Sequence, residues 1–104
     1  MRKRKKPQNR ALRRKVIVQN EVGLHARPAK NLVSELNKYI SDVYIEKTDG
    51  YRINAKSIIG VLTLAAVKGT ELMVIAEGED AEQVLEIVQH MFEEGFGEDP
   101  KVSP

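Results

Sequence analysis

Two kinds of apolar pattern alternate along this chain, and their order limits the folds that it can adopt. Short segments rich in β-branched or aromatic residues predict four strands, at residues 15–19, 43–47, 51–55 and 71–76. Apolar side chains that recur every three or four residues predict three helices, at residues 26–39, at 56–66, and from about 81 to the glycine at 95. The expected order of elements is therefore β-α-β-β-α-β-α.

The middle of the chain carries a hairpin signal. Asp49 and Gly50 lie between the second and third predicted strands, and an Asp-Gly turn between two such segments is typical of a β-hairpin. The two strands are expected to be antiparallel neighbours. Since the other strands are separated by helices, we expect an α+β open-faced sandwich, in which a four-stranded antiparallel sheet carries three helices on one face.

Residues suited to helix ends mark the boundaries of the predicted helices. Pro28 falls in the first turn of the first helix, where a missing N–H costs little. Ser57 is a suitable N-cap for the second helix. Asp80 and Gln83 have the spacing of a capping box at the start of the third, which Gly95 should end.

The composition fits one small domain preceded by a basic tail. The chain has 104 residues, of which 41% are hydrophobic, and its formal net charge is +2. That charge is unevenly distributed, because the first fifteen residues hold nine lysines and arginines and no acid. We expect residues 1–14 to form a disordered tail and residues 15–104 to form an acidic folded domain.

Several classes of protein are disfavoured by what the sequence lacks. No apolar run approaches the roughly 20 residues of a membrane-spanning helix, and no apolar segment of signal-peptide length follows the basic start. The absence of cysteine removes disulfides, thiolate metal sites and thiol nucleophiles. We expect a cytoplasmic protein that needs neither a metal nor another cofactor.

His25 directly precedes the first predicted helix, and Arg27 follows it by two residues. Unpaired N–H groups of the first turn and the positive end of the helix dipole would lie beside the imidazole. A positive potential disfavours imidazolium, which keeps the ring nucleophilic, and it favours a phosphate attached to that ring. Arg27 would add a bidentate partner for phosphate oxygens. The same pair also fits a helix cap and a solvated surface charge, and spacing alone does not decide between these interpretations.

The second histidine, His90, lies inside the last predicted helix between Gln89 and Met91. No cysteine and no tight group of histidine and carboxylate residues accompanies it, as a metal site would require. We expect His90 to be an ordinary helix residue.

Two motifs resemble those of a known family. GLHARPA at residues 23–29 and KSIIGVL at residues 56–62 are similar to the two signatures of HPr, the histidine-containing phosphocarrier family of the phosphoenolpyruvate-dependent phosphotransferase system. The similarity runs from about residue 15 to residue 95. It implies that His25 accepts a phosphoryl group on Nδ1 from phospho-enzyme I and passes it to an enzyme IIA-type protein. It further implies that Arg27 and the backbone N–H groups of Ala26 and Arg27 stabilise the phosphate, in a carrier rather than an enzyme.

The second motif has two interpretations of its own. The resemblance implies that Ser57 is phosphorylated by an ATP-dependent HPr serine kinase, whereas its position alone is explained by N-capping. The resemblance also implies that Ile58, Ile59 and Leu62 form an apolar patch on which partner proteins dock. A helix that is apolar nearly all round cannot bury every side chain against one sheet, so we expect one or two of these three to be exposed.

The branch of the family and the rival functions stay open. KSIIG at residues 56–60 is similar to members whose serine is a kinase target, while GFGED at residues 95–99 resembles the nitrogen-related, regulatory members. From the residues alone, the rival is a small regulatory α+β module that binds an anion or a partner without covalent chemistry. The basic tail suits nucleic acid, but the acidic domain argues against a nucleic-acid-binding protein.

Overall fold

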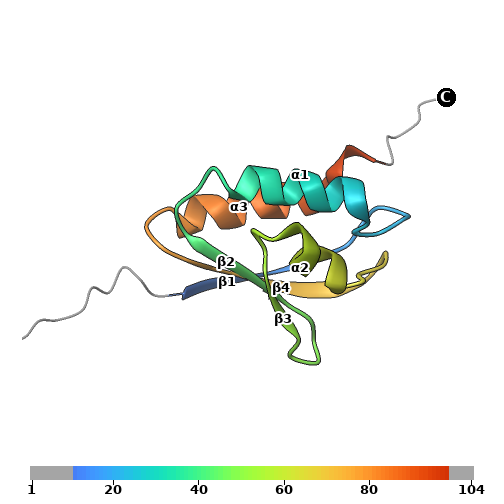
Figure 1. The fold of residues 1–104 in the computed structure, drawn as a ribbon, viewed down its shortest axis with the longest axis horizontal. Coiled ribbons are helices and arrows are strands. Elements are labelled where there is room, and N and C mark those ends of the chain that lie inside the picture. The colour runs from blue at the N-terminus through green and yellow to red at the C-terminus, as the bar shows by residue number, and fades with distance from the viewer. Residues whose placement is uncertain (1–10, 99–104) are drawn as a thin grey trace, which may run out of the picture.

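In the computed structural model, which describes residues 11–98, helices pack on one antiparallel sheet (Figure 1). The strands are β1 (Ala11–Ile17), β2 (Asp42–Glu46), β3 (Arg52–Asn54) and β4 (Glu71–Glu77). The helices are α1 (Ala26–Leu36), α2 (Ile58–Thr63) and α3 (Ala81–Glu93), followed by the short 3₁₀ turn η2 (Gly95–Gly97). The predicted fold class and the predicted order of elements are confirmed.

The sheet has the order β1-β4-β2-β3, and every neighbouring pair is antiparallel. The first and last strands in sequence are therefore hydrogen-bonded to each other. The predicted hairpin joins β2 and β3, and its turn is closed by Gly50, which has φ +93° and donates its N–H to Lys47 O at 2.9 Å. Such a positive φ explains why glycine follows Asp49 in this turn.

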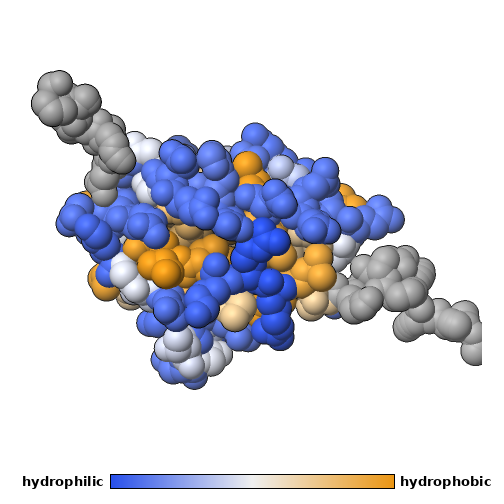
Figure 2. All heavy atoms as spheres, turned by 180° about the vertical axis from the view of Figure 1, so that it is seen from behind, coloured by the Kyte–Doolittle hydropathy of each residue, from blue (hydrophilic) through white to orange (hydrophobic). Residues whose placement is uncertain are grey.

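The core lies between the sheet and the helices. Apolar residues from every strand and from all three α-helices are buried there, the largest being Phe92, Leu32, Leu36, Ile45, Leu64 and Leu72. Alternate strand residues face away from the helices and are largely polar. On that face the register places Arg13 and Tyr44 on either side of the buried Ile75. In the view from behind, strongly hydrophilic residues cross the apolar surface (Figure 2).

The start of β1 corrects the predicted boundary between tail and domain. The strand begins at Ala11 rather than at Lys15. The reason is that β4 is long enough to pair with all of β1, from Ala11 opposite Glu77 to Ile17 opposite Glu71. Arg14, assigned to the tail from its charge, donates from Nη1 to Gln89 Oε1 on α3 at 2.8 Å. Pairing with a long strand outweighs the polar composition here. The rest of the predicted tail, residues 1–10, and residues 99–104 lie outside the described part of the chain.

Two helices are shorter than predicted. α1 ends at Leu36, where Asn37 Nδ2 donates to Val33 O at 2.8 Å, and Ile40 consequently leaves the apolar stripe and is 71% exposed. α2 covers six residues instead of eleven, and Ala65 just beyond it adopts φ +48°. That left-handed conformation is incompatible with continuing the helix.

Asp80 does not form the predicted capping box. Its side chain makes no capping hydrogen bond to α3 and instead accepts from Ile40 N at 2.9 Å, from Ser41 N at 3.0 Å and from the Ser41 hydroxyl. It thus holds the loop between α1 and β2 against the start of α3. Burial opposes ionisation of Asp80, but the hydrogen bonds from Ser41 and Ile40 outweigh it, so the pKa of this carboxyl lies below its usual range.

Asp80→Asn is expected to lower the free energy of unfolding by about 2 kcal/mol at neutral pH, because hydrogen bonds to a charged acceptor are lost. A carboxyl whose pKa is depressed in the folded state stabilises above its unfolded pKa, and that contribution is lost as pH falls through the folded value. Urea unfolding from pH 7 to pH 2.5 should therefore show the difference from wild type shrinking in acid. Asp42→Asn, at an exposed position on β2, is the control. A difference that did not vary with pH would contradict the role of the charge.

Candidate functional site

His25 is the N-cap residue of α1, at the predicted position. Its backbone is extended, with φ −85° and ψ −165°, and its carbonyl accepts the Ala29 N–H at 3.0 Å. Its side chain makes no capping hydrogen bond and is 38% exposed. The imidazole therefore does not serve as a helix cap, and one ring edge is open to solvent.

Gly23 fixes the loop that carries His25. It has φ +82°, and a Cβ atom at this position would lie 2.4 Å from the Ala66 carbonyl oxygen. The neighbouring Leu24 N–H donates to the same oxygen at 2.9 Å. Only glycine allows so close an approach at this φ. Gly23 therefore lets the histidine loop pack directly against the segment between α2 and β4.

The first turn of α1 presents backbone donors beside the imidazole. The N–H groups of Ala26 and Arg27 have no acceptor within the helix, and Pro28 has no N–H. No acidic side chain lies in this first turn, so the positive end of the helix dipole is not neutralised locally. Arg27 is exposed and makes no hydrogen bond or ion pair to any residue between 11 and 98. These groups suit an anion next to His25.

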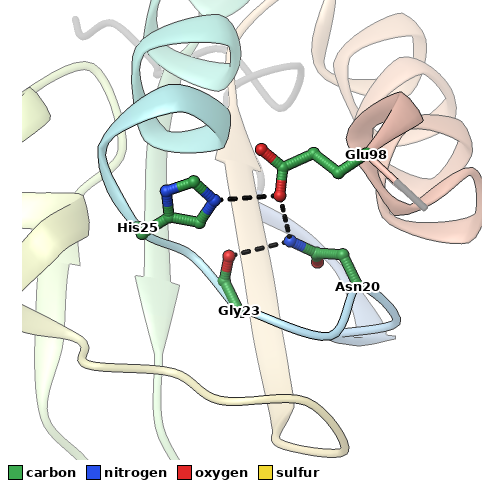
Figure 3. A network of polar contacts seen from close by, with 4 residues as sticks. All are labelled: Asn20, Gly23, His25 and Glu98. Atoms are coloured by element: carbon green, nitrogen blue, oxygen red, sulfur yellow. Dashed lines mark hydrogen bonds and ion pairs between the residues drawn. The ribbon is translucent and has the colours of Figure 1, made fainter.

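A carboxylate from the other end of the described chain contacts the imidazole (Figure 3). Glu98 Oε1 lies 2.9 Å from His25 Nε2 and also accepts from Asn20 Nδ2 at 3.0 Å. The second ring nitrogen, Nδ1, points away from Glu98 in Figure 3 and has no hydrogen-bond partner within residues 11–98. Asn20 and Glu98 were not predicted as site residues, since they are separated by 78 positions and only the fold brings them to His25.

The pKa of Glu98 reflects this arrangement. Burial opposes its ionisation, but hydrogen bonds from His25 and Asn20, and the charges of His25 and Arg27, outweigh that effect. The pKa of the Glu98 carboxyl therefore lies below its usual range. At neutral pH a carboxylate anion faces one edge of the imidazole.

The second motif forms the start of α2. Ser57 is the N-cap, and its Oγ accepts from Gly60 N at 3.1 Å, as predicted from its position. Ile58, Ile59 and Leu62 are 41%, 72% and 37% exposed. All three are exposed, whereas one or two were expected, because the shortened helix buries a single residue, Val61.

One exposed side chain of α2, Leu62, lies beside the histidine. A shallow hollow beside His25 is lined by residues of its own loop, of α2 and of the segment that follows α2, namely Val22, Leu24, Leu62, Ala65, Ala66 and Val67. Val22 and Val67 are themselves more than 60% exposed. An apolar surface therefore adjoins the open edge of the imidazole.

The remaining candidate lies apart from this site. His90 is an exposed residue of α3. Among residues 11–98, no group of three or more histidine, cysteine, aspartate or glutamate side chains has a geometry that could hold a metal ion. No helix in that part of the chain is both long enough and apolar enough to cross a membrane.

The chain is similar in sequence to known proteins. The family described as the PTS HPr component phosphorylation site matches residues 12–94. The HPr-like protein Crh of Bacillus subtilis is 49% identical over 75 residues, which cover 72% of this chain and 87% of the relative. The phosphocarrier protein HPr of Xylella fastidiosa strain 9a5c is 41% identical over 88 residues, which cover 85% of this chain and 98% of the relative.

A solved structure extends the likeness to three dimensions. The crystal structure of HPr-C-His from Thermoanaerobacter tengcongensis superposes with a TM-score of 0.80 at 34% identity, covering 86% of this chain and 99% of that one. The family match begins at residue 12, inside the part of β1 that composition had assigned to a tail. The chain therefore belongs to the HPr family, the phosphocarrier proteins of the phosphoenolpyruvate-dependent phosphotransferase system, which are carriers and not enzymes.

Proposed function

We propose that this chain accepts a phosphoryl group on His25 from phospho-enzyme I and passes it to enzyme IIA-type proteins in the cytoplasm. The observation that carries the proposal is the state of the imidazole. Its Nδ1 has no hydrogen-bond partner within residues 11–98, and the ring stands at the N-terminal end of α1. A nucleophilic nitrogen is thus exposed next to donors that suit a phosphate.

The chemistry needs little more than positioning and charge. In phosphoryl transfer, catalysis rests mainly on in-line placement and on stabilising the charge of the equatorial oxygens. The N–H groups of Ala26 and Arg27, together with the guanidinium of Arg27, supply that charge. Because Arg27 is exposed and forms no ion pair with any residue from 11 to 98, its guanidinium is available to the phosphate and can also release it to an acceptor.

The apolar surface beside His25 is the proposed docking site for both partners. Ile58, Ile59 and Leu62 are exposed on α2, and Leu62 also lines the hollow at His25. Exposed apolar patches of this kind are typical of protein–protein contacts. A partner that covers the patch would place its own phosphoryl donor or acceptor over the open edge of the imidazole.

A regulatory role of Ser57 is a second part of the proposal. Its hydroxyl already caps α2 and its neighbours Ile58 and Ile59 belong to the docking surface. A phosphate added by an HPr serine kinase would be tolerated at a helix N-terminus but would place a charge of about −2 beside an apolar contact. Phosphorylation of Ser57 would therefore control the rate of phosphoryl transfer through His25, whether the carrier serves in sugar transport or in regulation.

The phosphoryl acceptor is tested with purified enzyme I and phosphoenolpyruvate. We expect one acid-labile, base-stable phosphoryl group on the wild-type chain and none on His25→Ala, because phosphoramidates hydrolyse when protonated. Arg27→Ala should still be labelled, but roughly tenfold more slowly, since one charge-assisted contact to the phosphate is lost. Lys30→Ala, at an exposed position on the same helix, is the control for lost charge. Undiminished labelling of His25→Ala would refute the assignment and favour a non-covalent binding module.

The Ser57 proposal is tested with Ser57→Asp. We expect the KM of enzyme I for this carrier to rise severalfold while the melting temperature changes little, because the charge opposes docking and leaves the cap intact. Ser57→Ala controls for loss of the cap, and Ser34→Asp controls for a negative charge placed on the exposed face of α1. Equal KM values for Ser57→Asp and Ser34→Asp would leave Ser57 as a helix cap without a regulatory role.

A further inference from the structure

The contact between His25 and Glu98 constrains the proton of the imidazole. An ionised carboxylate has no hydrogen to donate and can only accept. With 2.9 Å between Glu98 Oε1 and His25 Nε2, Nε2 must carry the proton of this hydrogen bond. In the neutral ring Nδ1 is then unprotonated, and its lone pair points away from Glu98 (Figure 3).

Asn20 holds the carboxylate in place. It is 1% exposed, and its Nδ2 donates both to Glu98 Oε1 at 3.0 Å and to Gly23 O at 2.8 Å. Rotating the amide by 180° would turn its oxygen toward two other oxygens, so only one orientation is compatible with both neighbours. The Glu98 carboxylate is therefore held by the buried Asn20 side chain, which is itself held by its hydrogen bond to Gly23 in the histidine loop.

The turn that follows α3 places Glu98 beside His25. Gly95 and Phe96 adopt φ +61° and +56°, and the Phe96 ring packs edge-on against Phe92 with 4.9 Å between centroids. A non-glycine residue at positive φ persists only where its surroundings favour it. The aromatic contact and the buried Gly95, which lies against Asn20, turn the chain back toward His25.

We propose that Glu98, held by Asn20, is a positioning residue that makes Nδ1 the sole nucleophilic nitrogen of His25 and offsets the positive charge that the ring acquires on phosphorylation. The inference rests on the proposed role of His25 as phosphoryl acceptor. Glu98 itself touches neither phosphate nor partner in this role. It acts through the ring that it orients, as does the aspartate behind the histidine of a catalytic triad.

The step balances without an added acid or base. The Nδ1 lone pair forms the N–P bond while the bond from phosphorus to the donor's leaving atom breaks, and that atom keeps the electron pair. The Nε2 proton stays where it is, so the product ring is a phosphorylated imidazolium with one positive charge. Glu98 lies against that charge. In the onward transfer the N–P electrons return to Nδ1, and the same neutral tautomer is restored.

The position of the phosphate provides the sharpest test. Phosphoramidate, a small donor that needs no protein partner, is used to phosphorylate wild type, Glu98→Ala, Glu98→Gln and Glu94→Gln. The last variant removes one exposed negative charge four residues away and is the matched control. We expect wild type and control to carry phosphate on Nδ1 only, as read by ³¹P and ¹H NMR. Glu98→Ala should carry part of it on Nε2, since that nitrogen is released.

Rates and tautomers provide the second test. In Glu98→Gln the shape is kept and the charge is lost, so phosphorylation of Nδ1 should slow roughly tenfold relative to Glu94→Gln, as is typical when the hydrogen-bond partner that orients a histidine is removed. ¹⁵N spectra should show Nε2–H as the only neutral tautomer in wild type and a mixture in Glu98→Ala. Circular dichroism checks that each variant is folded.

The outcomes separate this inference from the proposed function. Phosphate on Nε2 of the wild type, an Nδ1–H tautomer, or equal rates for the Gln variants at positions 98 and 94 would overturn the role of Glu98. If phosphoramidate failed to react with any variant, the tautomer spectra would decide. Reaction at Nδ1 with phosphoramidate but none with phospho-enzyme I would leave the role of Glu98 standing and overturn the proposed partner.

Discussion

The pairing of β4 with a strand on each side is the constraint on which the rest of the structure depends. β4 binds β1 along seven residue pairs and β2 along five, and the ladder with β1 continues into hydrogen bonds between Val18 and residues 69 and 70. The chain leaving β1 is thereby held beside the segment that precedes β4. This is why Gly23 meets Ala66, and why His25 and α2 lie on the same side of the molecule.

Local chemistry made much of the fold and part of the site predictable from the sequence. The Asp-Gly turn at 49–50, the N-cap at Ser57 and the placement of His25 before a helix each depend on residues within one turn of chain. The contacts that sequence reasoning missed are long-range. Arg14 was assigned to a tail because its charge is visible in the sequence and its partner on α3 is not.

Competition between contacts explains the remaining differences. Asp80 has the spacing of a capping residue, yet the two backbone N–H groups at Ile40 and Ser41 offered it more hydrogen bonds than its own helix. α2 has the composition of a longer helix, but the conformation of Ala65 ends it early and leaves three of its apolar side chains uncovered. In both places the tertiary environment outweighed a correct local preference.

The contact between His25 and Glu98 also bears on when the site comes into existence. The two residues are 73 positions apart, so a ribosome translates the histidine early and its carboxylate partner close to the end of residues 11–98. A nascent chain that has formed α1 presents the imidazole without its oriented proton. The complete arrangement of Figure 3 is reached only after α3 and its closing turn have emerged and packed. Assembly of the histidine site is thereby tied to synthesis of the segment that follows α3, and fragments truncated before Glu98 would carry the ring without its partner.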